Sequence, residues 1–235
     1  KVVLNQADKI LYLSKFSEKI IKKEYPEFEK KAEHLTAGIP KNMFEPNFER
    51  DFNKNLFFTV RRLTPRMGLE NLIKAARVLD MKELDFKVEI AGTGHIEQRL
   101  KNLIEVYQLK NKVKLLGKIS DEELEKKYHE ASAFILPTTG LEGLGIATLE
   151  ALFSGCPVLG TPAGATPELL EPINRSLVFS EIDYQSIAKK IEWYIRLDNE
   201  KKEEFSKKGY NFVSENFTAE KMNAQLAAIC KSLLE

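Results

Sequence analysis

The sequence predicts an α/β fold in which a parallel sheet is covered by helices on both faces. Short apolar runs that are typical of strands alternate along the chain with longer segments whose apolar residues recur at helical spacing. Several of the strand-like runs end at a glycine, as at Gly92 and Gly117. Of the 235 residues, 43% are hydrophobic and 30% are charged, so the chain has enough apolar material for a buried core. Strands that alternate with helices in this way are typical of parallel sheets.

The first 55 residues have a less regular pattern than the rest of the chain. Ser14 and Ser17 are each suited to cap the first predicted helix, since a serine hydroxyl can accept a hydrogen bond from a free backbone N–H. Residues 40–55 are polar, contain Pro46 and show no clear period, so we expect a linker there. The elements predicted before this linker are a strand over residues 9–14, a helix over residues 16–24 and a short strand over residues 34–39.

Strands and helices alternate regularly from residue 56 onward. The run Ser120-Asp-Glu-Glu123 is a capping box, which predicts the start of a helix, and Gly155 predicts the end of another. Right-handed crossovers place the carboxyl ends of all parallel strands at one edge of the sheet, so we expect the ligand there. The predicted strands cover residues 56–60, 86–91, 113–116, 133–136, 157–160 and 177–179, and the predicted helices cover residues 69–79, 96–107, 120–131, 145–154, 166–170, 183–197, 200–215 and 218–234.

Charge and composition argue against several classes of protein. A formal net charge of +1 gives no support to a nucleic acid or other polyanion as partner. The two cysteines and three histidines have no metal-ligand spacing, so we expect reduced thiols and no metal site. No apolar run approaches the roughly 20 residues that span a bilayer, and no signal peptide is visible, so we expect a cytoplasmic protein. The chain begins with Lys1 rather than Met, from which we expect a longer parent protein.

The stretch from Glu142 to Glu150 places two carboxylates around a glycine-rich turn that leads into a helix. The helix is predicted to begin near Gly145, where its free N–H groups and the positive end of its dipole suit a phosphate. Glu150 lies about 7.5 Å further along the helix axis, at ~1.5 Å per residue, so the two acids can contact different parts of one long ligand. Glu150 is suited to accept two hydroxyls, as a ribose offers, while Glu142 lies nearer the phosphate. Taken alone, the pair fits equally well a charge that complements the helix end and a carboxylate on the surface.

Three arginines, Arg61, Arg62 and Arg66, follow the first strand of the regular part and form a candidate cationic site. A guanidinium group matches the geometry of phosphate oxygens and stays charged at any working pH. The alternative is a solvated surface cluster.

Two further loops follow the next two predicted strands. Gly92 and Gly94 allow a ligand to approach the backbone closely, although a glycine pair also makes an ordinary turn. Backbone groups at Lys118 and Ile119 could contact the edge of a base, and a plain connection from strand to helix fits this segment equally well.

Taken together, these motifs resemble a known family. The sequence from Glu142 to Pro162 resembles the paired-glutamate signature of the retaining glycosyltransferases of family 4, which have the GT-B fold of two Rossmann-like domains around a cleft. The resemblance implies the end of an N-terminal domain with a linker over residues 1–50, a Rossmann-like nucleotide-sugar-binding domain over residues 51–217 and a C-terminal helix over residues 218–235. Further similarity lies in the phosphate loop (residues 62–68), the second glycine turn (residues 91–94), the end of the third strand (residues 116–117) and the Gly-Gly-x-x-Glu element (residues 163–168).

The resemblance also implies a role for each candidate residue. In the family the second glutamate binds the ribose of a nucleoside diphosphate sugar and the first lies at the sugar, which correspond to Glu150 and Glu142. Arg62, with Arg66 close by, would bind the diphosphate and stabilise the leaving group. The family transfers the sugar with retention of configuration and needs no metal or other cofactor, and the base of the donor (UDP, GDP or ADP) stays open. The remaining substrate-binding residues would be Gly143, Leu144, Gly145, Ile146, Gly92, Gly94, Lys118 and Ile119.

The chain departs from the family pattern at two positions and nearly lacks one domain. Met67 stands where the family has a lysine before Gly68, and Ala163 replaces the first glycine of the usual pair. Most acceptor-binding groups of the family lie in the N-terminal domain, through which the whole protein could also contact a membrane. We therefore expect this chain alone to bind nucleotide weakly and to transfer no sugar.

Two other functions stay open at this point. A non-catalytic module could keep the nucleotide pocket, which Met67 slightly favours, and a sugar-nucleotide epimerase could share the same architecture. The pair of glutamates and the small number of histidines disfavour the epimerase. A receiver-like signalling domain would need clustered aspartates after the first strand, where arginines stand.

Overall fold

The computed structural model describes residues 2–40 and 42–234. Within them, the main sheet is parallel and has the order β5 (Val113–Gly117), β4 (Lys87–Ala91), β3 (Leu56–Val60), β6 (Ala133–Leu136) and β7 (Val158–Gly160). The chain runs from β3 to the β5 edge and then returns to the other side of β3, so its direction reverses between β3 and β6. Loops diverge at such a reversal and leave a crevice at the carboxyl ends of the strands, where open parallel sheets bind ligands.

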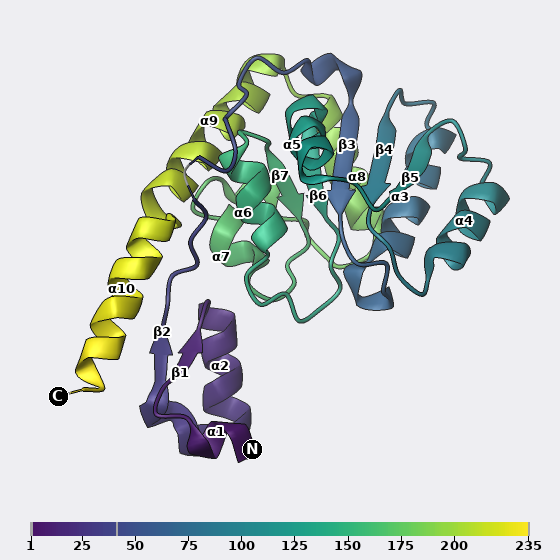
Figure 1. The fold of residues 1–235 in the computed structure, drawn as a ribbon. Helices are drawn as coiled ribbons and strands as arrows, with labels where there is room; N and C mark the ends of the chain where they lie inside the picture. The colour runs from purple at the N-terminus through teal and green to yellow at the C-terminus, as the bar shows by residue number, and fades with distance from the viewer. Residues whose placement is uncertain (1, 41, 235) are drawn as a thin grey trace.

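Helices cover both faces of this sheet, which confirms the predicted fold class (Figure 1). The first crossovers place α3 (Leu69–Met81) and α4 (Glu97–Val106) on one face, where α8 (Tyr184–Ile195) packs against α3. The later crossovers place α5 (Asp121–Glu130) and α6 (Ile146–Phe153) on the opposite face, where α9 (Asn199–Asn216) packs against α6. The short α7 (Thr166–Leu170) follows β7.

The central strands are buried on both faces, which explains their unbroken apolar sequence. All residues of β6 are buried, and so are Phe57 and Phe58 of β3. Tyr128 of α5 is fully buried, and its ring centroid lies 5.6 Å from that of Phe58 and 5.7 Å from that of Phe134. Aromatic contacts of this kind bury large areas and fix α5 against the two strands between which the chain direction reverses.

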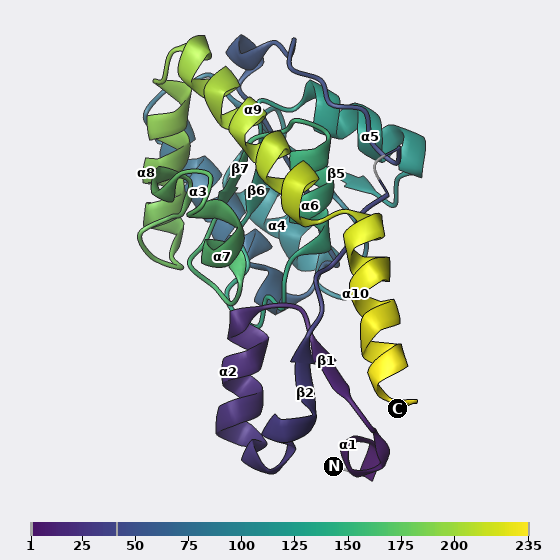
Figure 2. The same cartoon turned by 90° about the vertical axis from the view of Figure 1, so that its left-hand side faces the viewer.

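The N-terminal segment forms a second parallel sheet that lies beyond the carboxyl ends of the main sheet (Figures 1 and 2). Its strands are β1 (Ile10–Tyr12) and β2 (Ala32–His34), with α1 (Val2–Gln6) before them and α2 (Lys15–Glu24) between them. The long α10 (Ala219–Ser232) runs beside this segment (Figure 2). Its Gln225 side chain donates to the carbonyl of His34 at 2.6 Å and accepts from the N–H of Thr36 at 2.9 Å.

Two predicted strands were wrong. The strand expected over residues 34–39 lies instead at β2, because its parallel partner β1 is short and the chain enters α2 directly after Ser14. Ile39 forms only an isolated bridge with Thr218. The strand expected over residues 177–179 is replaced by a 3-10 turn over Arg175–Leu177, since the Asn174 side chain accepts from the N–H of Ser176 and starts that turn. Val178 keeps an isolated bridge with Gly160.

Two predicted helix starts were confirmed. The hydroxyl of Ser14 accepts from the N–H of Ser17 and caps α2. Ser120 and Glu123 form the reciprocal hydrogen bonds of a capping box at the start of α5. These signals are local in sequence, which is why the sequence predicts them well.

In the described part of the expected linker, residues 42–51 form no helix or strand and a 3-10 turn follows over Phe52–Lys54, but one residue is firmly held. Arg50 is buried, and its guanidinium donates hydrogen bonds of 2.7–3.1 Å to backbone carbonyls. This side chain therefore ties the segment before β3 to the main sheet and its helices. The accepting carbonyls belong to Asn47, Tyr128, Ala131 and Ser154.

Candidate functional site

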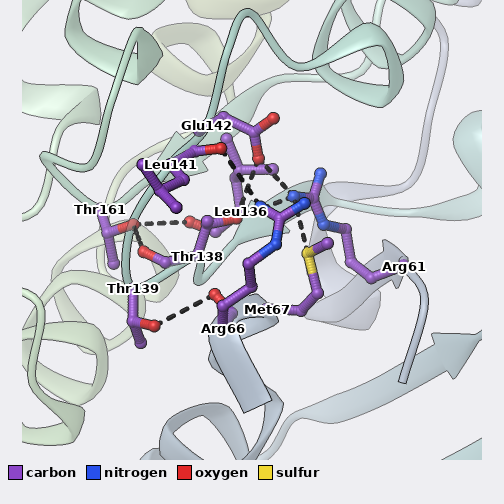
Figure 3. A network of polar contacts seen from close by, with 9 residues as sticks. All are labelled: Arg61, Arg66, Met67, Leu136, Thr138, Thr139, Leu141, Glu142 and Thr161. Atoms are coloured by element: carbon purple, nitrogen blue, oxygen red, sulfur yellow. Dashed lines mark hydrogen bonds and ion pairs between the residues drawn. The ribbon is translucent and has the colours of Figure 1, made fainter. Parts of the chain in front are cut away.

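The loops that follow β3 and β6 lie against each other where the chain direction reverses (Figure 3). The backbone N–H and the hydroxyl of Thr139 both donate to the carbonyl of Arg66, at 2.9 and 3.1 Å. Gly68 ends the first loop with φ +71°, and a Cβ atom there would lie 1.7 Å from the carbonyl oxygen of Pro137. Only glycine fits so close a contact, so the two loops form one continuous edge.

An ion pair between Arg61 and Glu142 joins these two loops (Figure 3). The same Nη2 atom of Arg61 also donates to the hydroxyl of Thr138 at 2.9 Å and lies 3.2 Å from the sulfur of Met67. The Thr138 hydroxyl in turn donates to Oε2 of Glu142 at 3.1 Å. The side chains of Arg61 and Glu142 are only 7% and 10% exposed, so each charge has lost most of its water and depends on the other.

A third loop, after β7, supports the backbone of Glu142. The N–H of Ala165 donates to the Glu142 carbonyl at 2.8 Å. Gly164 has φ +60°, and a Cβ atom there would lie 2.2 Å from the same carbonyl oxygen. The second glycine of the Gly-Gly-x-x-Glu resemblance is therefore required by packing against Glu142. Ala163 is buried at the first position and adopts no left-handed backbone, so the alanine there is tolerated.

The N-terminus of α6 lies directly after this loop. Gly145 is its N-cap residue, with φ +91°, and no side chain caps the first turn. Leu144 and Gly145 are buried, whereas Gly143 and Ile146 are exposed. The first turn thus offers N–H groups and the positive end of a helix dipole to an anion.

Glu150 lies one turn further along α6 and is half-buried. The hydroxyl of Tyr128 donates to its Oε2 atom at 3.0 Å. Burial raises the pKa of Glu150, and the hydrogen bond from Tyr128 partly opposes this rise. Burial, followed by the nearby Glu150 charge, raises the pKa of Tyr128 well above its usual value, so the phenol is a hydrogen-bond donor at neutral pH.

The glycine turn after β4 packs on the arginine loop. A Cβ atom at Gly92 would lie 1.9 Å from the carbonyl oxygen of Arg61, and one at Gly94 would lie 2.3 Å from that of Leu63. The N–H of Leu63 donates to the Thr93 carbonyl at 2.9 Å. Both glycines thus hold the Arg61 loop in place, and a direct contact to a ligand stays a prediction.

The structure brings only some of the predicted site residues together. Arg66 donates to the Leu141 carbonyl at 3.2 Å and so joins the Glu142 loop. Arg62 is exposed, and its side chain forms no hydrogen bond or ion pair with the residues that the structure describes. Lys118 is exposed and Ile119 packs on the core, and no hydrogen bond within residues 2–40 and 42–234 connects either to the Glu142 group.

Arg61 is one of the three candidate arginines in the sequence, but the family resemblance gives the phosphate role to Arg62 and Arg66, and Thr138 lies in no motif that the sequence predicts. A signal for Arg61 was present, because it is the first residue after β3, the strand beside which the chain direction reverses. Thr138 likewise comes two residues after β6. Polar residues at these two strand ends are the ones that a parallel sheet brings closest to a ligand.

A cavity of about 510 Å³ lies between the N-terminal segment and the loop that holds Glu142. The Ser14 hydroxyl donates to the Gly143 carbonyl at 2.5 Å across the same junction. Glu168 of α7 accepts from the N–H groups of Lys15 and Phe16 at 2.8 and 2.7 Å. The main sheet thus holds the N-terminal segment at its carboxyl edge through the cap of α2. From the N-terminal side the cavity is lined by Leu11, Tyr12, Leu13, Ser17, Ile20 and Ile21.

Among the described residues, no group of three or more His, Cys, Asp or Glu side chains is placed to hold a metal ion. In the same part of the chain, every helix is too short or too polar to span a bilayer. At the carboxyl edge of the main sheet, the arginines and the first turn of α6 described above could hold an anionic ligand.

Comparison with known proteins gives consistent matches. The model of a family described as glycosyl transferases group 1 matches residues 41–212. WcaL of Salmonella typhimurium, whose name assigns it to colanic acid biosynthesis as a glycosyltransferase, is 32% identical over 180 residues, which are 74% of this chain and 44% of WcaL. A GDP-mannose-dependent monoacylated alpha-(1-6)-phosphatidylinositol monomannoside mannosyltransferase of Corynebacterium glutamicum is 30% identical over 187 residues, 71% of this chain and 48% of that protein. The chain thus spans less than half of each of these relatives.

A solved structure has the same fold. HepE of Anabaena, in a crystal structure in complex with UDP and glucose, superposes with a TM-score of 0.85 at 20% identity. The superposition covers 98% of this chain and 66% of HepE. The N-terminal segment is therefore included in the shared fold.

Proposed function

Because the chain belongs to the group 1 glycosyl transferases, we propose that the carboxyl edge of its main sheet binds a nucleoside diphosphate sugar as donor for glycosyl transfer. The observation that carries the proposal is the largely buried ion pair between Arg61 and Glu142, which lies beside the uncapped first turn of α6. Guanidinium groups and free helix N–H groups are the usual partners of phosphate oxygens. A diphosphate at this edge would lie between the arginine loop and the start of α6.

Several of the predicted residues take a part in this proposal. The Glu150 carboxylate, oriented by Tyr128, accepts the ribose hydroxyls. The first-turn N–H groups of α6 bind the diphosphate, and Glu142 lies at the sugar. Arg62 and Arg66 lie on the same loop as Arg61 and are exposed. Arg62 is free to turn towards the phosphates, whereas Arg66 would exchange its hydrogen bond to the Leu141 carbonyl for one to a phosphate.

The proposed reaction is sugar transfer with retention, as in family 4. The bond between the anomeric carbon and the diphosphate oxygen breaks, and the acceptor hydroxyl oxygen bonds to that carbon on the same face. The hydroxyl proton passes to the departing diphosphate. Cations and helix N–H groups that stabilise negative charge on the leaving group lower the barrier of such a step, which needs no group other than those of the protein.

The acceptor is proposed to enter from the side of the N-terminal segment. The cavity between that segment and the Glu142 loop opens beside the expected position of the sugar. The names of WcaL and of the mannosyltransferase favour a polysaccharide or lipid-linked glycan as acceptor. Because the chain spans less than half of these relatives, we propose that further acceptor-binding groups lie outside it and that the chain alone transfers no sugar.

Ligand-induced stabilisation tests the donor site. Thermal unfolding is measured with UDP, GDP, ADP and their sugars, and at least one should stabilise the chain, by about 2.7 kcal/mol at a concentration 100 times its Kd. Glu150→Gln should lose most of that effect, whereas Glu171→Gln, at an exposed carboxylate directly after α7, should keep it. If none of the nucleotides or their sugars stabilised the chain, the proposal of a donor site would be contradicted.

A non-catalytic binding module is the second candidate, because Met67 stands in place of a phosphate-binding lysine. Sugar transfer by the full-length parent protein distinguishes the two. In an enzyme, Glu142→Ala should abolish transfer, whereas a binding module has no transfer to lose. Turnover by the present chain alone would overturn the statement that it is inactive without further residues.

A further inference from the structure

The arginine loop contains one cation whose environment differs from that of its neighbours. The Arg61 side chain points inward and is only 7% exposed, while Arg62 and Arg66 are exposed. We propose that Arg61 binds the diphosphate of the donor in place of the lysine that Met67 replaces, and that Glu142 holds it ready until the donor binds. This inference rests on the proposed function, and it assigns the phosphate contact to a residue outside the family motif.

The guanidinium of Arg61 lies beside the end of the Met67 side chain. Its Nη2 atom lies 3.2 Å from the Met67 sulfur, so the guanidinium occupies the space beside the end of that side chain. Met67 is buried and contributes no charge. The site therefore keeps one cation at this point, although the residue that supplies it comes six positions earlier in the chain.

The Arg61 guanidinium is incompletely satisfied. Its Nε atom is buried and has no hydrogen-bond partner among the described residues. A buried N–H without a partner is costly, and each such group in a native structure calls for an explanation. A guanidinium also cannot lose its proton, so it stays positive and offers this N–H to an anion.

Glu142 is the carboxylate that balances Arg61 in the absence of a ligand. Both side chains are largely buried, and removal of either would leave the other as an uncompensated charge. A diphosphate carries more negative charge than one carboxylate, so it competes with Glu142 for the same guanidinium. An Arg61 that turns to the diphosphate leaves Glu142 free to accept hydrogen bonds from the sugar hydroxyls.

A purely structural role is the competing explanation, since the Arg61–Glu142 pair also joins two loops. The two roles differ in what they predict for ligands. A structural arginine would affect the binding of nucleoside and nucleoside diphosphate alike. A phosphate-binding arginine would affect the nucleoside diphosphate alone.

The proposal is tested by moving the positive charge from residue 61 to residue 67. Calorimetric titrations with UDP, GDP and ADP, and with the nucleosides, are made on the wild-type chain, Arg61→Met, and Arg61→Met combined with Met67→Lys. We expect Arg61→Met to raise the Kd of the preferred nucleoside diphosphate about ten- to hundredfold, as for the loss of a charged hydrogen bond, and to leave nucleoside binding unchanged. The lysine in the double variant should recover most of the loss.

Two controls keep the outcome interpretable. Arg77→Met removes an arginine of an ion pair on α3, 3.1 Å from Asp80, and should leave the Kd unchanged. Arg61→Met leaves the buried Glu142 carboxylate without its partner, which could unfold the chain. The comparison is therefore repeated with Glu142→Gln present in every protein. Thermal unfolding is recorded for each variant.

The possible results separate this inference from the proposed function. If the wild-type chain binds no nucleoside diphosphate, the proposed function fails. If the wild-type chain binds one and both Arg61→Met proteins bind it equally well, Arg61 is not a phosphate ligand and only this inference fails. An equal loss for nucleoside and nucleoside diphosphate, without rescue by Met67→Lys, would assign Arg61 a structural role and would also overturn it.

Discussion

The hydroxyl of Tyr128 donates a hydrogen bond to Oε2 of Glu150 at 3.0 Å and thereby joins α5 to α6. Tyr128 is fully buried against β3 and β6, so its hydroxyl has a fixed position. A carboxylate held by such a donor keeps one orientation, which lowers the entropy cost of binding a ligand. The relationship therefore links the core of the sheet to the residue proposed to bind the ribose.

Nucleotide affinity should depend on the protonation of Glu150. Burial raises the pKa of Glu150. On acidification Glu150 therefore takes up a proton at a higher pH than an ordinary glutamate does, whose pKa is about 4.3. A protonated carboxyl loses acceptor capacity for the ribose hydroxyls, so the affinity for a nucleoside diphosphate should fall as the pH approaches that raised pKa. Glu150→Gln should lack this part of the pH profile. Identical profiles for both proteins, measured by calorimetry, would contradict the ribose role.

The same shift predicts a change in stability. A carboxyl whose pKa is raised by folding stabilises the folded state below the pKa of the unfolded chain, and this contribution is lost as the pH rises through the folded pKa. Glu150→Gln should therefore be more stable than the wild type at pH 7, with a difference that shrinks towards pH 4. Urea unfolding at several pH values measures it. If Glu150→Gln were less stable than the wild type at pH 7, the Glu150 charge would stabilise the folded state, which would contradict this prediction.

Removal of the Tyr128 hydroxyl should raise the pKa of Glu150 further, because that hydrogen bond lowers it. Tyr128→Phe should therefore move the acid limb of nucleotide binding to higher pH and cost about 1 kcal/mol of unfolding free energy. Tyr107→Phe, at the end of α4 and away from the carboxyl edge, is the matched control. An unchanged binding profile in Tyr128→Phe would show that the hydroxyl does not orient Glu150.

Arg50 should contribute strongly to stability without contacting the ligand. Its guanidinium satisfies backbone carbonyls around the end of α5 and α6. Arg50→Met leaves these buried acceptors without a donor, and we expect a loss on the order of 3 kcal/mol or more in urea unfolding. Arg175→Met, at an exposed arginine, should change stability little. If Arg50→Met lowered the unfolding free energy no more than Arg175→Met does, water would replace the Arg50 contacts and the predicted role would be contradicted.

Glu168 should hold the N-terminal segment at the carboxyl edge. Its carboxylate accepts from the first N–H groups of α2, at Lys15 and Phe16. Loss of such a cap typically costs about 1 kcal/mol, so Glu168→Ala should speed hydrogen exchange in α2 while the strands of the main sheet keep their protection. Glu171→Ala, at the residue directly after the same short helix, is the control. Equal exchange in α2 for both variants would contradict the role of Glu168.

The parts of the fold that depend on local sequence were predictable. The strands β3 and β6 are buried on both faces and so carry unbroken apolar runs, and the capping box at Ser120 needs only residues within one turn. The candidate site was located from glycines and charges at strand ends, because the parallel topology brings those ends to one edge.

Contacts between distant residues were not predictable in the same way. Arg61 and Glu142 are separated by 81 positions, and nothing local in the sequence selects Arg61 over Arg62 or Arg66 for burial. Gly92 and Gly94 pack on the backbone carbonyls of Arg61 and Leu63, contacts between loops that the sequence alone does not reveal. The strand expected over residues 34–39 failed for a related reason, because its length is set by β1, a partner more than 20 residues away.

Amide chemical-shift mapping can locate a nucleoside diphosphate at the carboxyl edge of the main sheet. UDP, GDP and ADP are titrated into the isotope-labelled chain, with Glu150→Gln as a second sample. We expect at least one nucleotide to shift the amides of residues 61–68 and 143–150, and we expect the shifts to weaken in Glu150→Gln. Shifts confined to other surfaces, or no shifts with any of the three nucleotides at millimolar concentration, would contradict the proposed donor site.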